Sequence, residues 1–235
     1  MKNLLVLLFL FILLFTNCGD KTKESNSPAS SSNSIEQSSK SSLVKEVQEK
    51  EKKKKRVVFF GNSLTAGYGL DPDQSFTSLI QKRIDSLSLD YKVINAGLSG
   101  ETTAGGASRI DWILKQPIDI FVLELGGNDG LRGIDPESSF KNLQSIINKV
   151  KAKNPATKIV LAGMEAPPNM GEEFTATFRA MYPKLAKTNN TYLIPFLLEN
   201  VGGIPELNQP DGIHPTAKGN IIITETIWKV LKEVL

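Results

Sequence analysis

The chain from residue 57 onward alternates between two hydrophobic patterns. Short and almost continuous apolar runs are typical of parallel strands that are buried on both faces of a sheet. Such runs predict strands at residues 57–60, 91–96, 118–125, 158–162 and 192–196. Between them, apolar residues recur every three or four positions, which is typical of amphipathic helices. That spacing predicts helices at residues 76–87, 103–114, 136–153, 174–187 and 216–234.

The alternation of strands and helices indicates the fold class. Parallel strands need long crossover connections, and a helix usually forms each crossover. We therefore expect an α/β protein with a flavodoxin-like three-layer α/β/α arrangement around a five-stranded parallel sheet. Neither a repeat nor a second linker interrupts residues 57–235, so these residues are predicted to form one domain. In such sheets, ligands bind beyond the carboxyl ends of the strands.

The N-terminal residues follow a different pattern, which predicts export. Lys2 precedes an apolar run at residues 4–15, which is shorter than the roughly 20 residues that span a bilayer and has the length of a signal-peptide core. Cys18 follows where bacterial lipoproteins carry their lipidated cysteine, although Asn17 stands where a small residue is usual. We favour a lipoprotein signal peptide at residues 1–18, and an ordinary cleaved signal with an incidental cysteine is the alternative.

Residues 19–56 are predicted to be a flexible tether. Ten of the 18 residues from 25 to 42 are serine, and Lys and Glu dominate residues 45–56. Such a composition buries too little apolar surface to offset the cost of ordering the chain. We therefore expect a membrane-anchored lipoprotein whose domain faces the periplasm or the cell surface.

Charge and composition exclude several kinds of function. The net charge is +3, but residues 1–56 hold 11 Lys/Arg and 6 Asp/Glu, whereas residues 57–235 hold 17 and 19. The main domain is therefore slightly acidic, which argues against a nucleic-acid partner. A single cysteine excludes an intramolecular disulfide and a Cys-rich zinc site. A single histidine and scattered carboxylates also give no ligand spacing for a metal site. We expect no cofactor, and the sequence indicates no obligate protein partner.

Side chains suited to nucleophilic catalysis follow the predicted strands. Ser63 lies after the first strand, in GNSLTAGYG at residues 61–69, at a Gly-flanked turn into a helix. A serine needs a base to act as a nucleophile near neutral pH, and His214 is the only imidazole in the chain. Asp211, three residues before it, is close enough to orient the ring. Each signal is weak alone, because a Ser after a strand is usually a helix cap and Asp-Gly is a common turn.

Attack on an acyl carbon also needs donors for the oxyanion that forms. Suitable donors are the backbone amides of Ser63 and Gly100 and the side-chain amide of Asn128. Gly100 lies in NAGLSGET at residues 95–102, and Asn128 lies in GGNDG at residues 126–130. Both segments follow predicted strands, so all of these groups are expected at one edge of the sheet.

These blocks resemble the SGNH (GDSL-type) hydrolase family, and within it the bacterial thioesterase I/lysophospholipase (arylesterase) branch. LELGGNDGLRG at residues 123–133 and YPKLAK at 182–187 are very similar to that branch, and the resemblance covers residues 57–235. It implies that Ser63, His214 and Asp211 form the catalytic triad and that Ser63, Gly100 and Asn128 form the oxyanion hole. One departure is that the name-giving motif has Asp where this chain has Asn62.

The resemblance implies ester and thioester substrates with fatty acyl groups, including lysophospholipids, and a predicted membrane anchor favours lipid esters. Pro168 and Met170, in a loop after the fourth strand, are expected to line an acyl-chain groove, or else to belong to a connector without a ligand role. Two other readings stay open. The same triad also suits deacylation of cell-envelope carbohydrate, and a non-catalytic lipoprotein would use the cleft for binding only.

Overall fold

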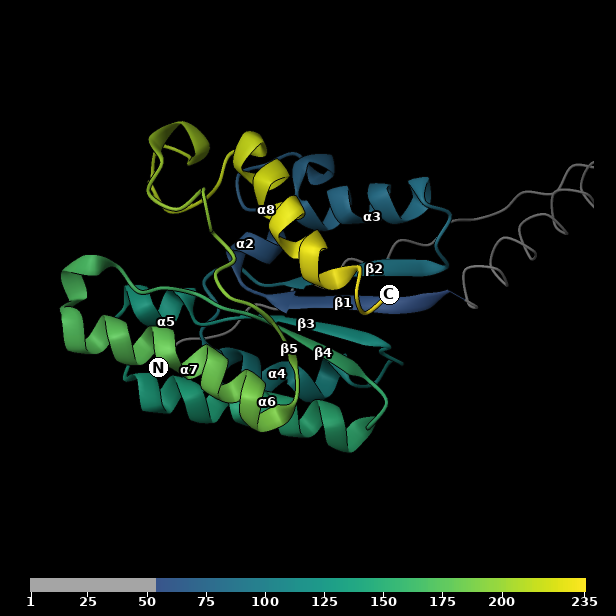
Figure 1. The fold of residues 1–235 in the computed structure, drawn as a ribbon, viewed down its shortest axis with the longest axis horizontal. Coiled ribbons are helices and arrows are strands. Elements are labelled where there is room, and N and C mark those ends of the chain that lie inside the picture. The colour runs from purple at the N-terminus through teal and green to yellow at the C-terminus, as the bar shows by residue number, and fades with distance from the viewer. Residues whose placement is uncertain (1–53) are drawn as a thin grey trace, which may run out of the picture. The chain divides into compact units, whose positions relative to one another are not determined.

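The computed structural model describes residues 54–235, which form a five-stranded parallel sheet with helices on both faces (Figure 1). The strands are β1 (Lys55–Gly61), β2 (Tyr91–Gly97), β3 (Ile120–Glu124), β4 (Lys158–Ala162) and β5 (Tyr192–Ile194). Their order across the sheet is β2-β1-β3-β4-β5, and every neighbouring pair is parallel. This is the flavodoxin-like order, so the predicted fold class is confirmed.

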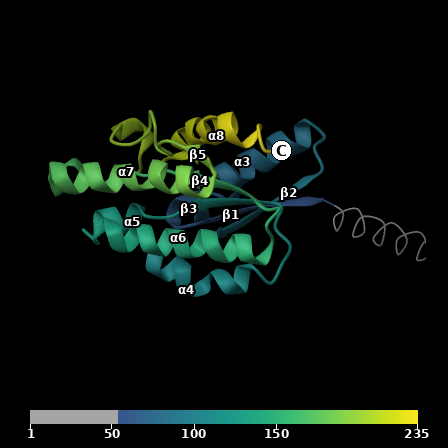
Figure 2. The same ribbon diagram turned by 60° about the horizontal axis from the view of Figure 1, so that its bottom comes forward.

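The helices form two layers around the sheet. They are α2 (Ser63–Ala66), α3 (Phe76–Ser86), α4 (Thr103–Ile113), α5 (Gly127–Leu131), α6 (Pro136–Lys153), α7 (Glu172–Asn189) and α8 (Ala217–Leu231). Helices α3 and α8 pack together on one face, whereas α4, α6 and α7 pack together on the other (Figure 1). Figure 2 shows the same separation of α3 and α8 from α4 and α6.

The core lies between these layers and explains the continuous apolar runs. The side chains of β1 from Val57 to Phe60 and of β3 from Ile120 to Leu123 are all buried. A central strand covered by helices on both faces has no solvent side, so it carries apolar residues at consecutive positions. The two central strands therefore form a rigid base, and the loops after them are held at their carboxyl ends.

Most predicted boundaries hold within a few residues, and the differences have local causes. β1 begins at Lys55 rather than at residue 57, so it includes two residues that were assigned to the tether. These residues are polar but still form the parallel ladder with β2. β5 ends at Ile194 because Pro195 follows, and proline cannot donate a ladder hydrogen bond. The short helices α2 and α5 were not predicted, since four or five residues show no periodicity.

The predicted signal peptide (1–18), with Cys18, and most of the predicted tether (19–56) lie outside the described residues. Within the part of the chain that the structure describes, none of the helices is both long enough and apolar enough to cross a membrane.

Candidate active site

The turn between β1 and α2 positions the predicted nucleophile. Gly61 is the last residue of β1, and Asn62 caps α2 by accepting a hydrogen bond from the backbone N–H of Leu64 at 2.9 Å. Ser63 is the first residue of that helix, where backbone N–H groups have no intrahelical partner. Gly67 ends the helix with a φ of 77°, which is the left-handed conformation that glycine adopts at low cost. The hydroxyl and the amide of Ser63 are thus both presented at the sheet edge.

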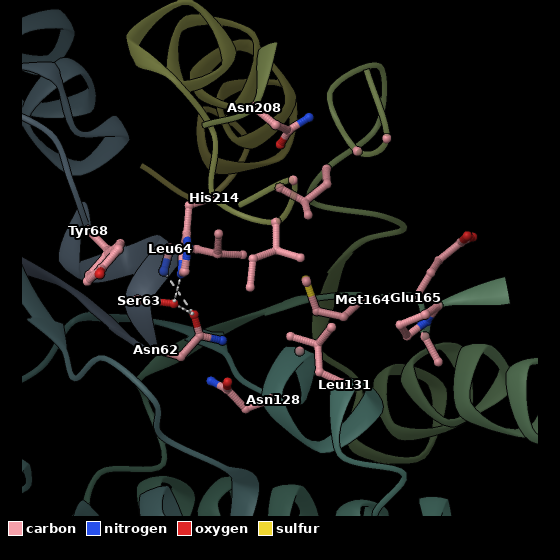
Figure 3. A pocket seen from close by; sticks show the side chains of 18 of the residues that line it. Asn62, Ser63, Leu64, Tyr68, Asn128, Leu131, Met164, Glu165, Asn208 and His214 are labelled. Carbon is pink, nitrogen blue, oxygen red and sulfur yellow. Dashed lines mark hydrogen bonds between the residues drawn. The ribbon is translucent and has the colours of Figure 1, made fainter. Parts of the chain in front are cut away.

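The structure brings Ser63, His214 and Asp211 together, although 151 residues separate the first two. Ser63 Oγ lies 2.9 Å from His214 Nε2 (Figure 3). On the other side of the ring, His214 Nδ1 lies 2.7 Å from Asp211 Oδ2. A base on the hydroxyl and a carboxylate on the base are the arrangement that activates a serine.

A tight loop before α8 fixes the Asp211 carboxylate against His214. Asp211 Oδ1 accepts the backbone N–H groups of Ile213 and His214, both at 3.0 Å. The hydrogen bonds from the His214 side chain and from these two amides lower the pKa of Asp211 to about 2. The loop is closed by an antiparallel bridge between Asn208 and Pro215. The carboxyl group is therefore ionised across the neutral pH range and favours the imidazolium that forms when His214 takes a proton.

Tyr68 also contacts the imidazole, and nothing in the sequence pattern indicates this contact. Its ring centroid lies 4.6 Å from that of His214, with an angle of 37° between the ring planes. Tyr68 follows α2 at the rim of the site and is half exposed. It therefore covers one face of the His214 ring and restricts where the ring can move.

The predicted oxyanion donors lie beside Ser63. Gly100 has a φ of 80°, and among the described residues its backbone amide donates to no other group. Asn128 Nδ2 donates to the backbone oxygen of Glu101 at 3.0 Å, which fixes the amide and leaves it a second hydrogen. Ser63, Gly100 and Asn128 all line one cavity. Arg109 holds the carboxylate of Glu101 through two contacts of 2.5 Å and so steadies the loop that carries Gly100.

A buried carboxylate, that of Glu124, lies behind the nucleophile turn. Glu124 is the last residue of β3, and its side chain reaches the turn after β1, where it contacts Asn62 and Thr65. Burial raises the pKa of Glu124 to about 7, although hydrogen bonds from Thr65 and Asn62 act in the opposite direction. Sequence reasoning did not assign Glu124 a role at the site. The signal available was a charged residue at the end of an otherwise apolar strand.

A cavity of about 590 Å³ opens beside Ser63. Its walls carry mostly apolar side chains, as in pockets that hold organic ligands. They include Leu131, Met164, Ala166, Pro167, Pro168, Phe196, Leu198 and Ile213. Figure 3 shows Leu131 and Met164 on the far side of this cavity from Tyr68.

The two residues predicted to bind an acyl chain have different positions. Pro168 lines the cavity beside Ser63. Met170, two residues later, does not line it, and lies instead in a separate hollow with Glu172 and Phe174. Residues 168–170 form a 3₁₀ turn that ends at Gly171, and its two end residues border different hollows.

The described residues offer no obvious place for a metal ion, because none of their His, Asp and Glu side chains form a group of three or more with suitable geometry. What they provide is a hydroxyl, an imidazole, a carboxylate and amide donors beside an apolar cavity. Together, these groups can carry out acyl transfer with water as the final acceptor.

Comparisons with known proteins found one family model and several relatives that match most of the described residues. The model of the GDSL-like lipase/acylhydrolase family matches residues 59–221. Esterase TesA of Pseudomonas aeruginosa is 40% identical over 176 residues, which cover 74% of this chain and 87% of that protein. Thioesterase 1/protease 1/lysophospholipase L1 of Escherichia coli K12 is 36% identical over 180 residues, covering 76% and 84%. A crystal structure of TesA matches with a TM-score of 0.74 at 39% identity, covering 77% of this chain and all of the other.

Proposed function

This chain belongs to the GDSL-like lipase/acylhydrolase family, and we propose from that premise that it hydrolyses ester or thioester bonds of lipid-like acyl substrates. The protein is a serine ester hydrolase. The proposal assigns the nucleophile to Ser63, the general base and acid to His214, and the orienting carboxylate to Asp211. The observation that carries it is the pair of contacts at 2.9 and 2.7 Å that joins the three side chains.

The reaction proceeds in two halves. His214 Nε2 takes the proton of the Ser63 hydroxyl while Oγ forms a bond to the acyl carbon. His214 then gives this proton to the departing alcohol or thiol as the bond to that group breaks, which leaves an acyl-enzyme. A water molecule repeats the cycle, with His214 again as the base, and the acyl group leaves as a carboxylic acid.

The oxyanion of each tetrahedral intermediate is held by three donors. These are the backbone amides of Ser63 and Gly100 and the side chain of Asn128. Asn128 is fixed by its hydrogen bond to the Glu101 carbonyl before any substrate arrives. Donors that need no reorganisation stabilise the developing charge most strongly.

The position and the apolar wall of the cavity indicate that it binds the acyl chain of the substrate. It is apolar on most of its wall and adjoins Ser63, so a chain lying in it leaves the carbonyl near the nucleophile. A relative that is 36% identical is named as a thioesterase and lysophospholipase. We therefore propose fatty acyl esters, with lysophospholipids among them, as the substrate class.

The cellular location belongs to the same proposal. It assigns an export signal to residues 1–18 and a lipid anchor to Cys18. The enzyme would then be held on a membrane, with its domain facing the periplasm or the cell surface. Lipid esters are available there, whereas acyl-CoA is confined to the cytosol. Metabolic labelling with a fatty-acid analogue tests the anchor, because Cys18→Ala removes the label if the assignment is correct.

The catalytic assignment is tested by a fluorophosphonate probe and by Ser63→Ala. The probe should label the full-length protein on the one peptide that contains Ser63, and Ser63→Ala should abolish labelling. Hydrolysis of an activated aryl ester should fall by a factor near 10⁶, as when triad members act as a unit. Near-normal turnover by Ser63→Ala would remove the nucleophile from its role.

The substrate class is tested by comparing kcat/KM across a panel. The panel contains lysophospholipids, long-chain acyl-CoAs and short aryl esters. A preference for lysophospholipids supports the proposal, whereas a clear preference for acyl-CoA overturns the lipid assignment. Release of acetate from acetylated glycans, without action on long chains, would favour the carbohydrate alternative.

A further inference from the structure

We propose that Glu124 is a positioning residue for the reaction: its carboxylate, paired with the side-chain amide of Asn62, holds the nucleophile turn so that Ser63 faces His214. Glu124 does not line the cavity and touches no reacting atom. It acts through the turn, so the inference rests on the proposed role of Ser63.

The two carboxylate oxygens of Glu124 accept hydrogen bonds from residues on both sides of Ser63 in the sequence. Oε1 accepts the side-chain amide of Asn62 at 2.9 Å. Oε2 accepts the backbone N–H of Asn62 at 3.1 Å, the backbone N–H of Thr65 at 3.3 Å and the hydroxyl of Thr65 at 2.8 Å. One carboxylate thus holds the residue before Ser63 and the residue two positions after it. It thereby ties the first turn of α2 to the end of β3.

Asn62 passes this constraint on to the nucleophile. Its side-chain oxygen accepts the backbone N–H of Leu64 at 2.9 Å and lies 3.5 Å from Ser63 Oγ (Figure 3). Its side-chain nitrogen must then face Glu124, so the orientation of the amide is fixed at both ends. Rotation of the Asn62 side chain would disturb the cap of the helix that carries Ser63.

Glu124 is buried, so its carboxylate depends on protein donors and not on solvent. Its exposed fraction is 1%. The titratable group that faces it from α7 is Tyr182, whose hydroxyl donates to the Leu125 carbonyl. From α4, the nearby cation is Arg109, which is paired with Glu101. Among the described residues, Glu124 takes part in no ion pair, so donors of the nucleophile turn alone satisfy it.

The chemistry of the pair provides a sharp test. In Glu124→Gln, one oxygen can still accept from Thr65, but the new amide nitrogen faces the amide nitrogen of Asn62, and two donors oppose each other. Adding Asn62→Asp to this variant restores a donor on one side and an acceptor on the other. In the double variant, residue 62 carries the carboxylate and residue 124 carries the amide. The pair therefore still consists of one amide and one carboxylate.

The experiment compares the full-length protein with Glu124→Gln and with the double variant Asn62→Asp/Glu124→Gln. The measurements are kcat and KM on a short aryl ester and the rate of labelling by a fluorophosphonate. Glu124→Gln is expected to lower kcat and the labelling rate at least tenfold while KM stays within twofold. The double variant is expected to recover most of this loss. An unchanged kcat in Glu124→Gln, or a double variant no faster than the single one, overturns the inference.

Asn189→Asp is the matched control for a lost buried hydrogen bond. Asn189 exchanges two hydrogen bonds with Gln144, at 2.7 and 2.8 Å, just before β5 and so at the opposite edge of the sheet from Ser63. It should lower the melting temperature but leave kcat unchanged. If it lowers kcat as much as Glu124→Gln does, the effect of Glu124 is only structural.

Two further variants separate a failure of the Glu124 role from a folding defect and from a failure of the proposed function. If Glu124→Gln does not fold, Thr65→Val removes one donor from the carboxylate with little change of shape. It should lower kcat several-fold, and an unchanged kcat again overturns the inference. Ser63→Ala is measured beside them: if it keeps activity, the proposed function fails, and if only the rescue fails, the role of Glu124 fails alone.

Discussion

Asp211 holds His214 at two points, through the ring nitrogen Nδ1 at 2.7 Å and through the backbone N–H at 3.0 Å. These contacts stabilise the carboxylate form and lower the pKa of Asp211 to about 2. Because this pKa is lowered, the contribution of Asp211 to stability is present above its ordinary pKa of 3.8 and is lost as the pH falls toward about 2. Loss of activity between pH 8 and 5 therefore does not report the protonation of Asp211.

Asp211→Asn should lower kcat by up to roughly 10⁴-fold, with a smaller change in KM. The amide can no longer balance the positive charge on His214, and the preferred tautomer of the ring changes. Steady-state kinetics on an aryl ester measure the effect. Asp73→Asn, which removes an exposed partner of Lys82, is the control and should match the wild type. A fall of less than tenfold would contradict the orienting role.

The pH dependence of stability should carry the signature of Glu124. Burial raises its pKa from the ordinary value of 4.5 to about 7, so the folded state holds this proton more tightly than the unfolded state does. The sign is therefore opposite to that of Asp211: the contribution of Glu124 to stability is fully present below pH 4.5 and is lost as the pH rises through about 7. The expected loss is about 3 kcal/mol.

Urea unfolding at pH 5 and pH 8 measures this loss. Relative to Glu124→Gln, which has no proton to lose at this position, the wild type should be less stable at pH 8 than at pH 5. Asn189→Ala keeps Glu124, adds no titratable group and should follow the pH trend of the wild type. Parallel curves for the wild type and Glu124→Gln would show that Glu124 titrates near its ordinary value in the folded protein.

The residues that meet at the site could be predicted because a parallel sheet gathers its carboxyl ends at one edge. Ser63, Gly100 and Asn128 each follow a strand, and apolar runs of four to eight residues mark those strands clearly. His214 is the only histidine in the chain, and Asp211 lies three residues before it. Both could therefore be predicted without the topology of the sheet. The periodicity of the sequence and the topology of a parallel sheet were therefore enough to predict that these distant residues lie at one edge.

Other features depend on details that periodicity does not contain. Glu124 contacts the nucleophile turn because the register of β1 and β3 pairs it with Gly61. That register is set by packing, and the sequence pattern alone leaves it open. Met170 lies outside the cavity because a 3₁₀ turn and Gly171, at φ 89°, direct its loop. Loop conformations of this kind follow from particular contacts rather than from a repeating pattern.

The same register makes Gly61 a sensitive position. A Cβ atom there would lie 2.2 Å from Thr65 Oγ1 and 2.4 Å from Glu124 Oε2. Gly61→Ala should therefore separate the two groups and lower kcat at least tenfold, with a loss of unfolding free energy of about 1–3 kcal/mol. Kinetics and urea unfolding measure both effects. Gly203→Ala is the control for inserting a methyl group, because open space surrounds that position, although its φ of 76° adds some strain. Equal kinetic losses in the two variants would contradict the specific role of Gly61.

The last prediction concerns the length of the acyl chain. Leu131 lines the cavity, so Leu131→Ala removes apolar contact from a bound chain but not from an acetyl group at Ser63. Burial of each CH₂ contributes about 0.8 kcal/mol, so kcat/KM for a decanoyl ester should fall by roughly three- to tenfold while that for an acetyl ester stays nearly constant. Leu87→Ala is the matched control, because Leu87 is similarly exposed and lies outside the cavity at the end of α3. If Leu131→Ala lowers both rates equally, the acyl chain does not lie in this cavity.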